Sequence, residues 1–150
     1  MENWLDPELI KTQETVDSWR DAAKKSGELL VNKGYVKADY IDKMIETVEE
    51  FGMYIVIVPG VALFHARPDE SVHKTGLSLL TIKGGVEFGV EDKDPVYLAF
   101  SLAAKDKESH LGMMQSLARV LRKEGSVEKL AKAKDSETLL TMINQLSKEA

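Results

Sequence analysis

Two of the three histidines in the sequence stand where apolar stretches end. His65 ends the stretch VALFH and is followed two residues later by Arg67. His110 lies six residues after Ala104, which ends the apolar stretch VYLAFSLAA. An imidazole close to a guanidinium suits the handling of an anion, and a phosphoryl group is the leading candidate.

Histidine can take up a phosphoryl group directly, because a neutral imidazole nitrogen is a nucleophile at pH 7. Negative charge spreads over the oxygens of the transferring group, so N–H groups, hydroxyls and arginines stabilise it. In this hypothesis His65 accepts the phosphoryl group, His110 orients it and Arg67 neutralises its charge. The plainer interpretation is that His65 is an edge histidine with satisfied hydrogen bonds, and that His110 and Arg67 are solvated surface residues. His73 lies among charged residues and is expected to be solvated.

The pattern of apolar residues predicts the elements that must position these side chains. Strands are expected at residues 54–58, 61–64, 76–82 with a turn at 83–85, and 96–104, with a further short strand near 9–12. Helices are expected at residues 17–34, 38–52, 106–125, 126–133 and 135–149. In the helix over 106–125, the residues expected to face inward are Leu111, Met114, Leu117, Ala118 and Leu121.

This order of helices, strands and helices predicts an α/β layered structure. In α/β sheets ligands collect at the carboxyl ends of strands, where helix N-termini offer N–H groups to anions. His65 and His110 therefore meet at one rim if the strands before them are parallel neighbours.

Composition narrows the classes of function and site. The chain has 150 residues, which favours one domain, and a net charge of −5 from 25 acidic and 20 basic residues. This charge argues against nucleic acid as the main partner. Absence of cysteine excludes disulfides and thiolate metal sites, and the histidines lack the spacing of metal ligands, so neither a metal nor a cofactor is expected. No apolar run reaches the ~20 residues of a membrane span, and we expect a cytoplasmic protein without direct membrane insertion.

Two segments resemble a known family. Residues 56–76, VIVPGVALFHARPDESVHKTG, and residues 86–121, VEFGVEDKDPVYLAFSLAAKDKESHLGMMQSLARVL, are similar to the IIA components (EIIA) of the bacterial phosphoenolpyruvate-dependent sugar phosphotransferase system (PTS), in the mannitol/fructose-type class. The resemblance extends from about Trp19 to Leu146. Within the class the ascorbate-specific branch is most similar, since its motif PGxAxPHxRPEE followed by KTG has close counterparts here. The matching residues are Pro59-Gly60, Ala62, His65, Arg67-Pro68-Asp69-Glu70 and Lys74-Thr75-Gly76.

The resemblance implies a fold and a reaction. The fold is an α/β sandwich with a mixed central β-sheet and helices on both faces, and residues 1–150 form a single EIIA type-2 domain. His65 would receive a phosphoryl group from the phosphorylated phosphocarrier protein HPr. It would pass this group to a cysteine of the cognate EIIB component, in a system for L-ascorbate or a related sugar. His110 matches the second active-site histidine of the family.

Two positions depart from the family pattern. The residue before the active histidine is usually proline, but here it is Phe64. Mannitol and fructose members carry an arginine 16 residues before the histidine, where this chain has Glu49, and we hypothesise that Arg67 takes over the role of that arginine. We also expect an apolar docking patch around Leu63 and Phe64, ringed by charges, to suit short-lived partners. The alternative is that Leu63 is a core residue and Phe64 a single exposed aromatic residue.

Two other functions remain open at this level. Similar EIIA-like domains act as regulators, in which histidine phosphorylation controls a partner instead of a transporter. A phosphoester hydrolase that uses two histidines is the third possibility, but it requires a general acid and a place for water that the sequence does not identify. Transfer of label from His65 to an EIIB partner, its retention, or release of free phosphate would separate these three functions.

Overall fold

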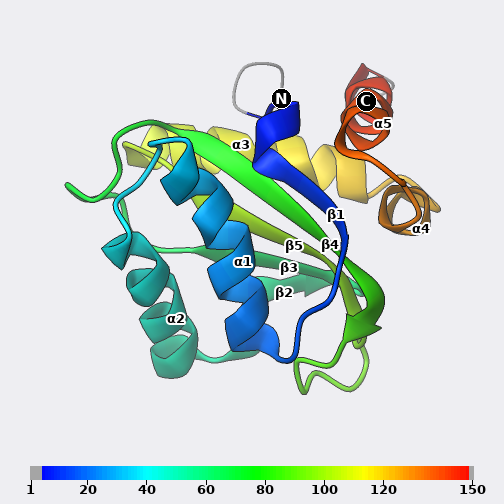
Figure 1. Cartoon of the computed structure of the whole chain (residues 1–150), viewed down its shortest axis with the longest axis horizontal. Coiled ribbons are helices and arrows are strands. Elements are labelled where there is room, and N and C mark those ends of the chain that lie inside the picture. The colour runs from blue at the N-terminus through cyan, green and yellow to red at the C-terminus, as the bar shows by residue number, and fades with distance from the viewer. Residues whose placement is uncertain (1–4, 149–150) are drawn as a thin grey trace.

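The computed structural model describes residues 5–148, in which one mixed β-sheet forms the centre of the molecule (Figure 1). Its strand order is β1-β4-β5-β3-β2. The strands are β1 (Ile10–Glu14), β2 (Val56–Val58), β3 (Val61–His65), β4 (Gly76–Val86) and β5 (Val96–Ala103). The β1–β4 and β3–β5 pairs are parallel, whereas the β4–β5 and β2–β3 pairs are antiparallel. The short strand expected near residues 9–12 is therefore present as β1.

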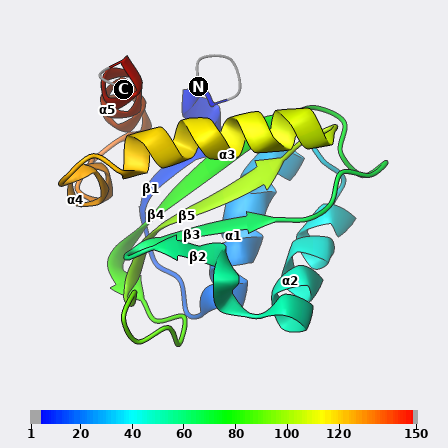
Figure 2. The same ribbon diagram turned by 180° about the vertical axis from the view of Figure 1, so that it is seen from behind.

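Helices cover both faces of this sheet, as Figures 1 and 2 show from opposite sides. Helices α1 (Trp19–Asn32) and α2 (Asp39–Phe51) lie on one face. Helix α3 (Lys107–Leu121) lies across the other face, followed by α4 (Ser126–Ala131) and by α5 (Ser136–Lys148), which packs against α3 and β1. The short 3₁₀ helices are η1 (Pro7–Leu9) and η2 (Met53–Ile55). The predicted fold, a mixed central sheet with helices on both faces, is confirmed.

The central strands are buried on both faces, as their nearly continuous apolar sequences predict. Every residue of β5 except Tyr97 is buried. Buried serines connect this strand to α1: the Ser26 and Ser101 hydroxyls lie 2.6 Å apart, and the Ser78 hydroxyl donates to the Ser26 carbonyl at 2.7 Å. None of the described residues has a buried side-chain nitrogen or oxygen without a hydrogen-bond partner, so the core tolerates these polar groups at little cost.

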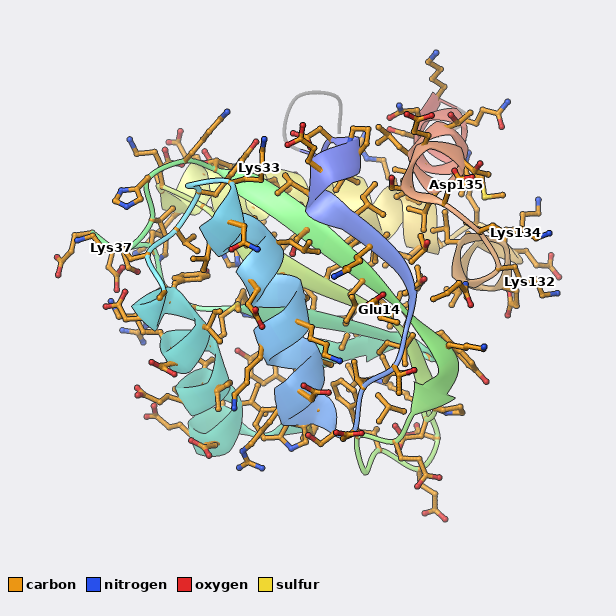
Figure 3. All side chains as sticks on the ribbon, in the orientation of Figure 1. Glu14, Lys33, Lys37, Lys132, Lys134 and Asp135 are labelled. Atoms are coloured by element: carbon orange, nitrogen blue, oxygen red, sulfur yellow. The ribbon has the colours of Figure 1, made fainter. Side chains whose placement is uncertain are left out.

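At the opposite side of the molecule from α2, the connection between α4 and α5 is fixed to the sheet by β1. The Thr12 hydroxyl donates to the Lys134 carbonyl at 3.0 Å, while the side chains of Lys132, Lys134 and Asp135 point outward (Figure 3). No helix in the described part of the chain is long and apolar enough to cross a membrane.

Two predicted strand boundaries are wrong. Residues 54 and 55 were expected in a strand, but Tyr54 and Ile55 belong to η2, and only Val56–Val58 is extended. Gly52 leaves α2 with φ +90°, and this geometry leads into the 3₁₀ turn that buries Ile55 and exposes Tyr54.

The expected turn at residues 83–85 is the second error, because β4 continues through it to Val86. Gly84 and Gly85 both have positive φ angles, and the pairing with β5 is irregular between Thr81 and Val86. The two glycines therefore make a bulge-like irregularity inside a long strand instead of ending it.

The inward face of α3 also differs from the prediction. Leu117 and Leu121 are buried as expected, but Leu111 is 57% exposed and Ala118 is exposed. Met113 and Val120 complete the buried stripe instead. The buried stripe of α3 therefore follows residues 113, 117, 120 and 121, and this face turns Leu111 and Ala118 toward solvent.

Candidate active site

The histidines at positions 65 and 110 are brought together by the pairing of two parallel strands. Strands β3 and β5 pair in continuous register, from Val61 opposite Leu98 to His65 opposite Leu102. Their carboxyl ends consequently lie at the same edge of the sheet, and α3 starts a few residues after β5 ends. The ring centroids of His65 and His110 are 5.3 Å apart, with the ring planes at 74°. His65 and His110 therefore meet at one rim, because the strands that precede them are parallel neighbours.

One ring nitrogen of His65 is engaged with the backbone, and the other faces outward. Nδ1 lies 3.1 Å from the Leu63 carbonyl oxygen, which can only accept a hydrogen bond. Nδ1 therefore carries the proton, and Nε2 keeps its lone pair. Burial of the half-buried ring lowers the pKa of His65, and this effect outweighs the opposing effect of the Leu63 carbonyl. The ring is thus neutral near pH 7, which is the form that acts as a nucleophile.

His110 is fixed in the first turn of α3 by a capped helix start. The Asp106 carboxylate accepts from the Ser109 N–H at 2.7 Å, and the His110 N–H donates to the Asp106 carbonyl at 3.1 Å. Hydrogen bonds from Ser109, led by its N–H, lower the pKa of Asp106. Burial, followed by the charge of His65, lowers the pKa of His110. The Asp106 carboxylate already accepts a hydrogen bond at this helix start. An anion at the rim is therefore bound by side chains more than by free backbone N–H groups.

Tyr40 of α2 ties together the two strand ends that carry the histidines. Its hydroxyl donates to the Leu102 carbonyl at 2.7 Å and accepts from the Ala66 N–H at 3.1 Å. Leu102 is the register partner of His65, and Ala66 is the residue after His65. The side chain is fully buried, and burial raises the pKa of Tyr40 to about 12. Sequence reasoning missed Tyr40, although its spacing of four and eight residues from Met44 and Val48 places it on the buried face of α2.

Tyr54 contacts His65 from the side opposite the backbone. Its hydroxyl lies 3.3 Å from His65 Nε2, and the two rings meet edge to face with centroids 5.8 Å apart. Sequence reasoning missed this residue as well. Its pattern resembles a strand, and nothing in the sequence indicates that a 3₁₀ turn directs it toward His65.

The two histidine rings lie in an open groove of about 1510 Å³ between α2 and the start of α3. Residues from α2, η2, the end of β3, the segment after β3 and the start of α3 line it; the charged ones are Lys43, Glu46, Glu50, Arg67, Asp69, Asp106 and Lys107. Arg67 is exposed, and its side chain has no hydrogen bond or ion pair within residues 5–148. The structure therefore brings Arg67 to the same groove as His65 and His110 and leaves its charge uncompensated by a carboxylate.

The segment that carries Arg67 is anchored by Asp69. Its carboxylate accepts from the Ser71 N–H at 2.8 Å and pairs with Lys43 of α2 at 2.7 Å. Hydrogen bonds from Lys43 and Ser71 lower the pKa of Asp69 to about 2. Lys43 is thereby committed to Asp69, so Arg67 and Lys107 remain the cations of the groove without a carboxylate partner among the described residues.

The predicted docking patch around Leu63 and Phe64 is wrong. Both side chains are core residues, and the Phe64 ring packs against Phe88 with centroids 6.0 Å apart. Alternation in β3 does not expose either residue, because helices cover both faces of the strand. The exposed large apolar side chains at this end of the molecule are Phe51 at 59%, Tyr54 at 52% and Leu111 at 57%.

Comparison with known proteins decides the family. Residues 3–146 match the family described as "Phosphoenolpyruvate-dependent sugar phosphotransferase system, EIIA 2". The chain belongs to this family. An ascorbate-specific PTS system EIIA component of Salmonella choleraesuis is 36% identical over 143 residues, which is 94% of this chain and 92% of the relative. EIIA components of the PTS are phosphotransferases, and the neighbouring neutral histidines fit that chemistry.

Solved EIIA structures have the same fold. The mannitol-specific cryptic phosphotransferase enzyme IIA of Escherichia coli aligns with a TM-score of 0.84 and 31% identity, over 95% of this chain and 97% of that one. The E. coli mannitol enzyme IIA, solved in complex with phosphorylated enzyme IIB, aligns with a TM-score of 0.83 and 26% identity, over 94% of this chain and 97% of that one.

Two EIIA positions noted in the sequence lie outside the groove. Glu49, which the resemblance places opposite the arginine of mannitol and fructose members, forms an exposed ion pair with Arg20 at 2.8 Å and does not line the groove. His73 is exposed and also lies outside the groove lining, with its backbone N–H donating to the Tyr35 carbonyl at 2.8 Å. Within residues 5–148 no three histidine, aspartate or glutamate side chains are grouped as a metal ion would require.

Proposed function

We propose that this EIIA protein is a phosphoryl carrier in which His65 Nε2 accepts a phosphoryl group from phospho-HPr and passes it to a cysteine of the cognate EIIB component. The observation that carries the proposal is the pair of neutral imidazoles, 5.3 Å apart in an open groove. The hydrogen bond from Nδ1 to the Leu63 carbonyl supports it further, because it leaves Nε2 as the nucleophile.

The reaction consists of two displacements at phosphorus. In the first, the His65 Nε2 lone pair attacks the phosphoryl group, the N–P bond of the donor histidine breaks, and the donor ring regains its lone pair. In the second, a cysteine thiolate of EIIB attacks, an S–P bond forms, and the Nε2–P bond breaks. The proton on Nδ1 stays in place through both steps, so no net proton transfer is needed.

His110 and Arg67 stabilise the charge of the transferring group in this scheme. The His110 ring lies beside His65 and donates an N–H to a phosphoryl oxygen. Arg67 supplies the positive charge, which is supported by its place in the groove and by the lack of a carboxylate partner within the described residues. In this proposal Arg67 serves where Glu49 has replaced the family arginine.

We assign the transport system to L-ascorbate or a related sugar, since an ascorbate-specific EIIA component is 36% identical over nearly the whole chain. We also propose that residues 1–150 act as one EIIA domain in the cytoplasm, where HPr and EIIB would dock in turn at the groove.

The test is reconstitution of the relay with phosphoenolpyruvate, enzyme I, HPr and the cognate EIIB. We expect an acid-labile phosphohistidine on the wild type that chases onto EIIB, and none on His65→Ala. His110→Ala should still become labelled but transfer more slowly. An EIIB variant with its acceptor cysteine changed to serine should leave the label on His65. Label on the His65→Ala variant would refute the assignment, label that never reaches EIIB would favour a regulator, and release of free phosphate with turnover would favour a hydrolase.

A further inference from the structure

Within residues 5–148, Tyr54 is the only residue whose side chain lies within hydrogen-bond distance of the reacting atom, His65 Nε2. Its hydroxyl lies 3.3 Å from His65 Nε2, whereas Nδ1 on the other side of the ring is held by the Leu63 carbonyl. Because Nδ1 carries the proton, Nε2 can only accept, and the tyrosine O–H is the donor in this contact. Within residues 5–148 the Tyr54 hydroxyl has no other partner.

The backbone around Tyr54 is fixed, although its ring is half exposed. Ile55, the next residue, is fully buried, and the N–H of Val56 donates to the Met53 carbonyl to close the 3₁₀ turn. The Lys93 ammonium also donates to the Val56 carbonyl at 3.1 Å. The turn therefore fixes the position from which the Tyr54 side chain starts, and the edge-to-face contact of its ring with His65 places the hydroxyl beside Nε2.

We propose that Tyr54 is a catalytic residue of this EIIA protein, whose hydroxyl donates first to the lone pair of His65 Nε2 and then to an oxygen of the phosphoryl group bound there. This deepens the proposed function and rests on it. The Nε2–P bond forms as the donor N–P bond breaks, and the tyrosine proton stays on its oxygen throughout. Only the acceptor of its hydrogen bond changes, from a neutral nitrogen to a charged oxygen. Hydrogen bonds to charged acceptors are the stronger kind, so the contact favours the phosphorylated state.

This arrangement surrounds the phosphoryl group with donors from three elements. Tyr54 approaches from η2, His110 from α3, and Arg67 from the segment after β3. Neither the short β2 strand nor the rest of η2 offers another donor to Nε2 among the described residues. Loss of the tyrosine hydroxyl is therefore expected to be uncompensated.

The test compares Tyr54→Phe with wild type and with Tyr97→Phe. Tyr97 lies outside the groove of His65, and its hydroxyl has no partner within residues 5–148. Two donors are used: phospho-HPr, and phosphoramidate, a small donor that needs no docking surface. Removing one hydrogen bond to a charged group predicts about a tenfold slower phosphorylation of His65 in Tyr54→Phe with both donors, and no change in Tyr97→Phe. Nitrogen NMR of His65 should also show a shifted Nε2 resonance only in Tyr54→Phe.

The outcomes separate this inference from the proposed function. If wild type is not phosphorylated on His65 at all, the proposed function fails, and the role of Tyr54 fails with it. If wild type is phosphorylated but Tyr54→Phe reacts at the same rate with phosphoramidate, only the inference is overturned. A slowing seen with phospho-HPr and absent with phosphoramidate would also overturn it, because Tyr54 would then act in docking alone.

Discussion

Replacing Tyr40 by phenylalanine tests whether the clamp between the two strand ends holds His65 in place. The substitution keeps the buried ring and removes only the hydroxyl, which bonds the Leu102 carbonyl at 2.7 Å and the Ala66 N–H at 3.1 Å. Each buried backbone group left unpaired costs about 1–3 kcal/mol, so with two such groups the unfolding free energy should fall by roughly 2–6 kcal/mol. This is a large part of the total for a domain of this size, about 5–15 kcal/mol.

Urea denaturation of Tyr40→Phe beside Tyr97→Phe measures this loss. Tyr97 has a half-buried side chain whose hydroxyl has no partner within the described residues, so its variant should differ from wild type by less than about 0.5 kcal/mol. Phosphorylation of His65 should slow in Tyr40→Phe alone, measured in urea-free buffer where the variant is still folded. A Tyr40→Phe protein as stable and as active as the control would refute the assignment of the hydroxyl as a clamp.

The same residue gives a pH signature. The pKa of Tyr40 is raised from 10.0 to about 12 in the folded protein, so the protonated hydroxyl stabilises the fold below pH 10. That contribution is lost as the pH rises from 10 toward 12, because the unfolded chain releases the proton first. We expect wild type to lose more unfolding free energy over this range than Tyr40→Phe does. Parallel losses in the two proteins would show that Tyr40 ionises as readily in the fold as in the unfolded chain.

Three further predictions concern the groove. Arg67→Ala should slow phosphoryl transfer to and from His65 about tenfold without changing the urea midpoint, and wild-type transfer rates would remove Arg67 from the mechanism. Leu111→Ser should raise the KM for phospho-HPr several-fold, because Leu111 is 57% exposed beside His110. The rate of phosphorylation by phosphoramidate should stay unchanged. An unchanged KM would place the docking surface elsewhere. Proton NMR should give His65 a pKa below 6.5, because burial disfavours its charged form, and the unfolding free energy should fall as the pH drops through 6.5, where the unfolded chain binds the proton more readily. A His65 pKa at or above 6.5 would contradict the effect of burial, and a pKa above 7 would contradict the neutral nucleophile.

The meeting of His65 and His110 could be predicted from the sequence, because both follow buried apolar stretches and the family motif places them together. Parallel pairing of β3 and β5 then supplies the rest. Periodicity could not place Tyr54 beside His65, since the 3₁₀ turn depends on the positive φ of Gly52 and on the burial of Ile55. Local pattern treats these residues as a strand.

The docking surface shows a different limit. The predicted docking patch needed Leu63 and Phe64 at the surface, and the helix pattern placed Leu111 in the core, but the structure buries the first two and exposes the third. A local apolar pattern indicates which residues avoid water but not which face of a helix packs on the sheet. The burial of Leu63 and Phe64 depends on the helices that cover β3, and the exposure of Leu111 depends on which face of α3 packs on the sheet. Both are tertiary facts.

The most direct test of the central claim is the identity of the phosphorylated atom. Phosphorus and nitrogen NMR of the protein after incubation with phospho-HPr distinguishes the two ring nitrogens of each histidine. We expect a single phosphohistidine, at His65 Nε2, with the Nδ1–H still donating a hydrogen bond to the Leu63 carbonyl. A phosphoryl group on His65 Nδ1, on His110 or on His73 would contradict the account.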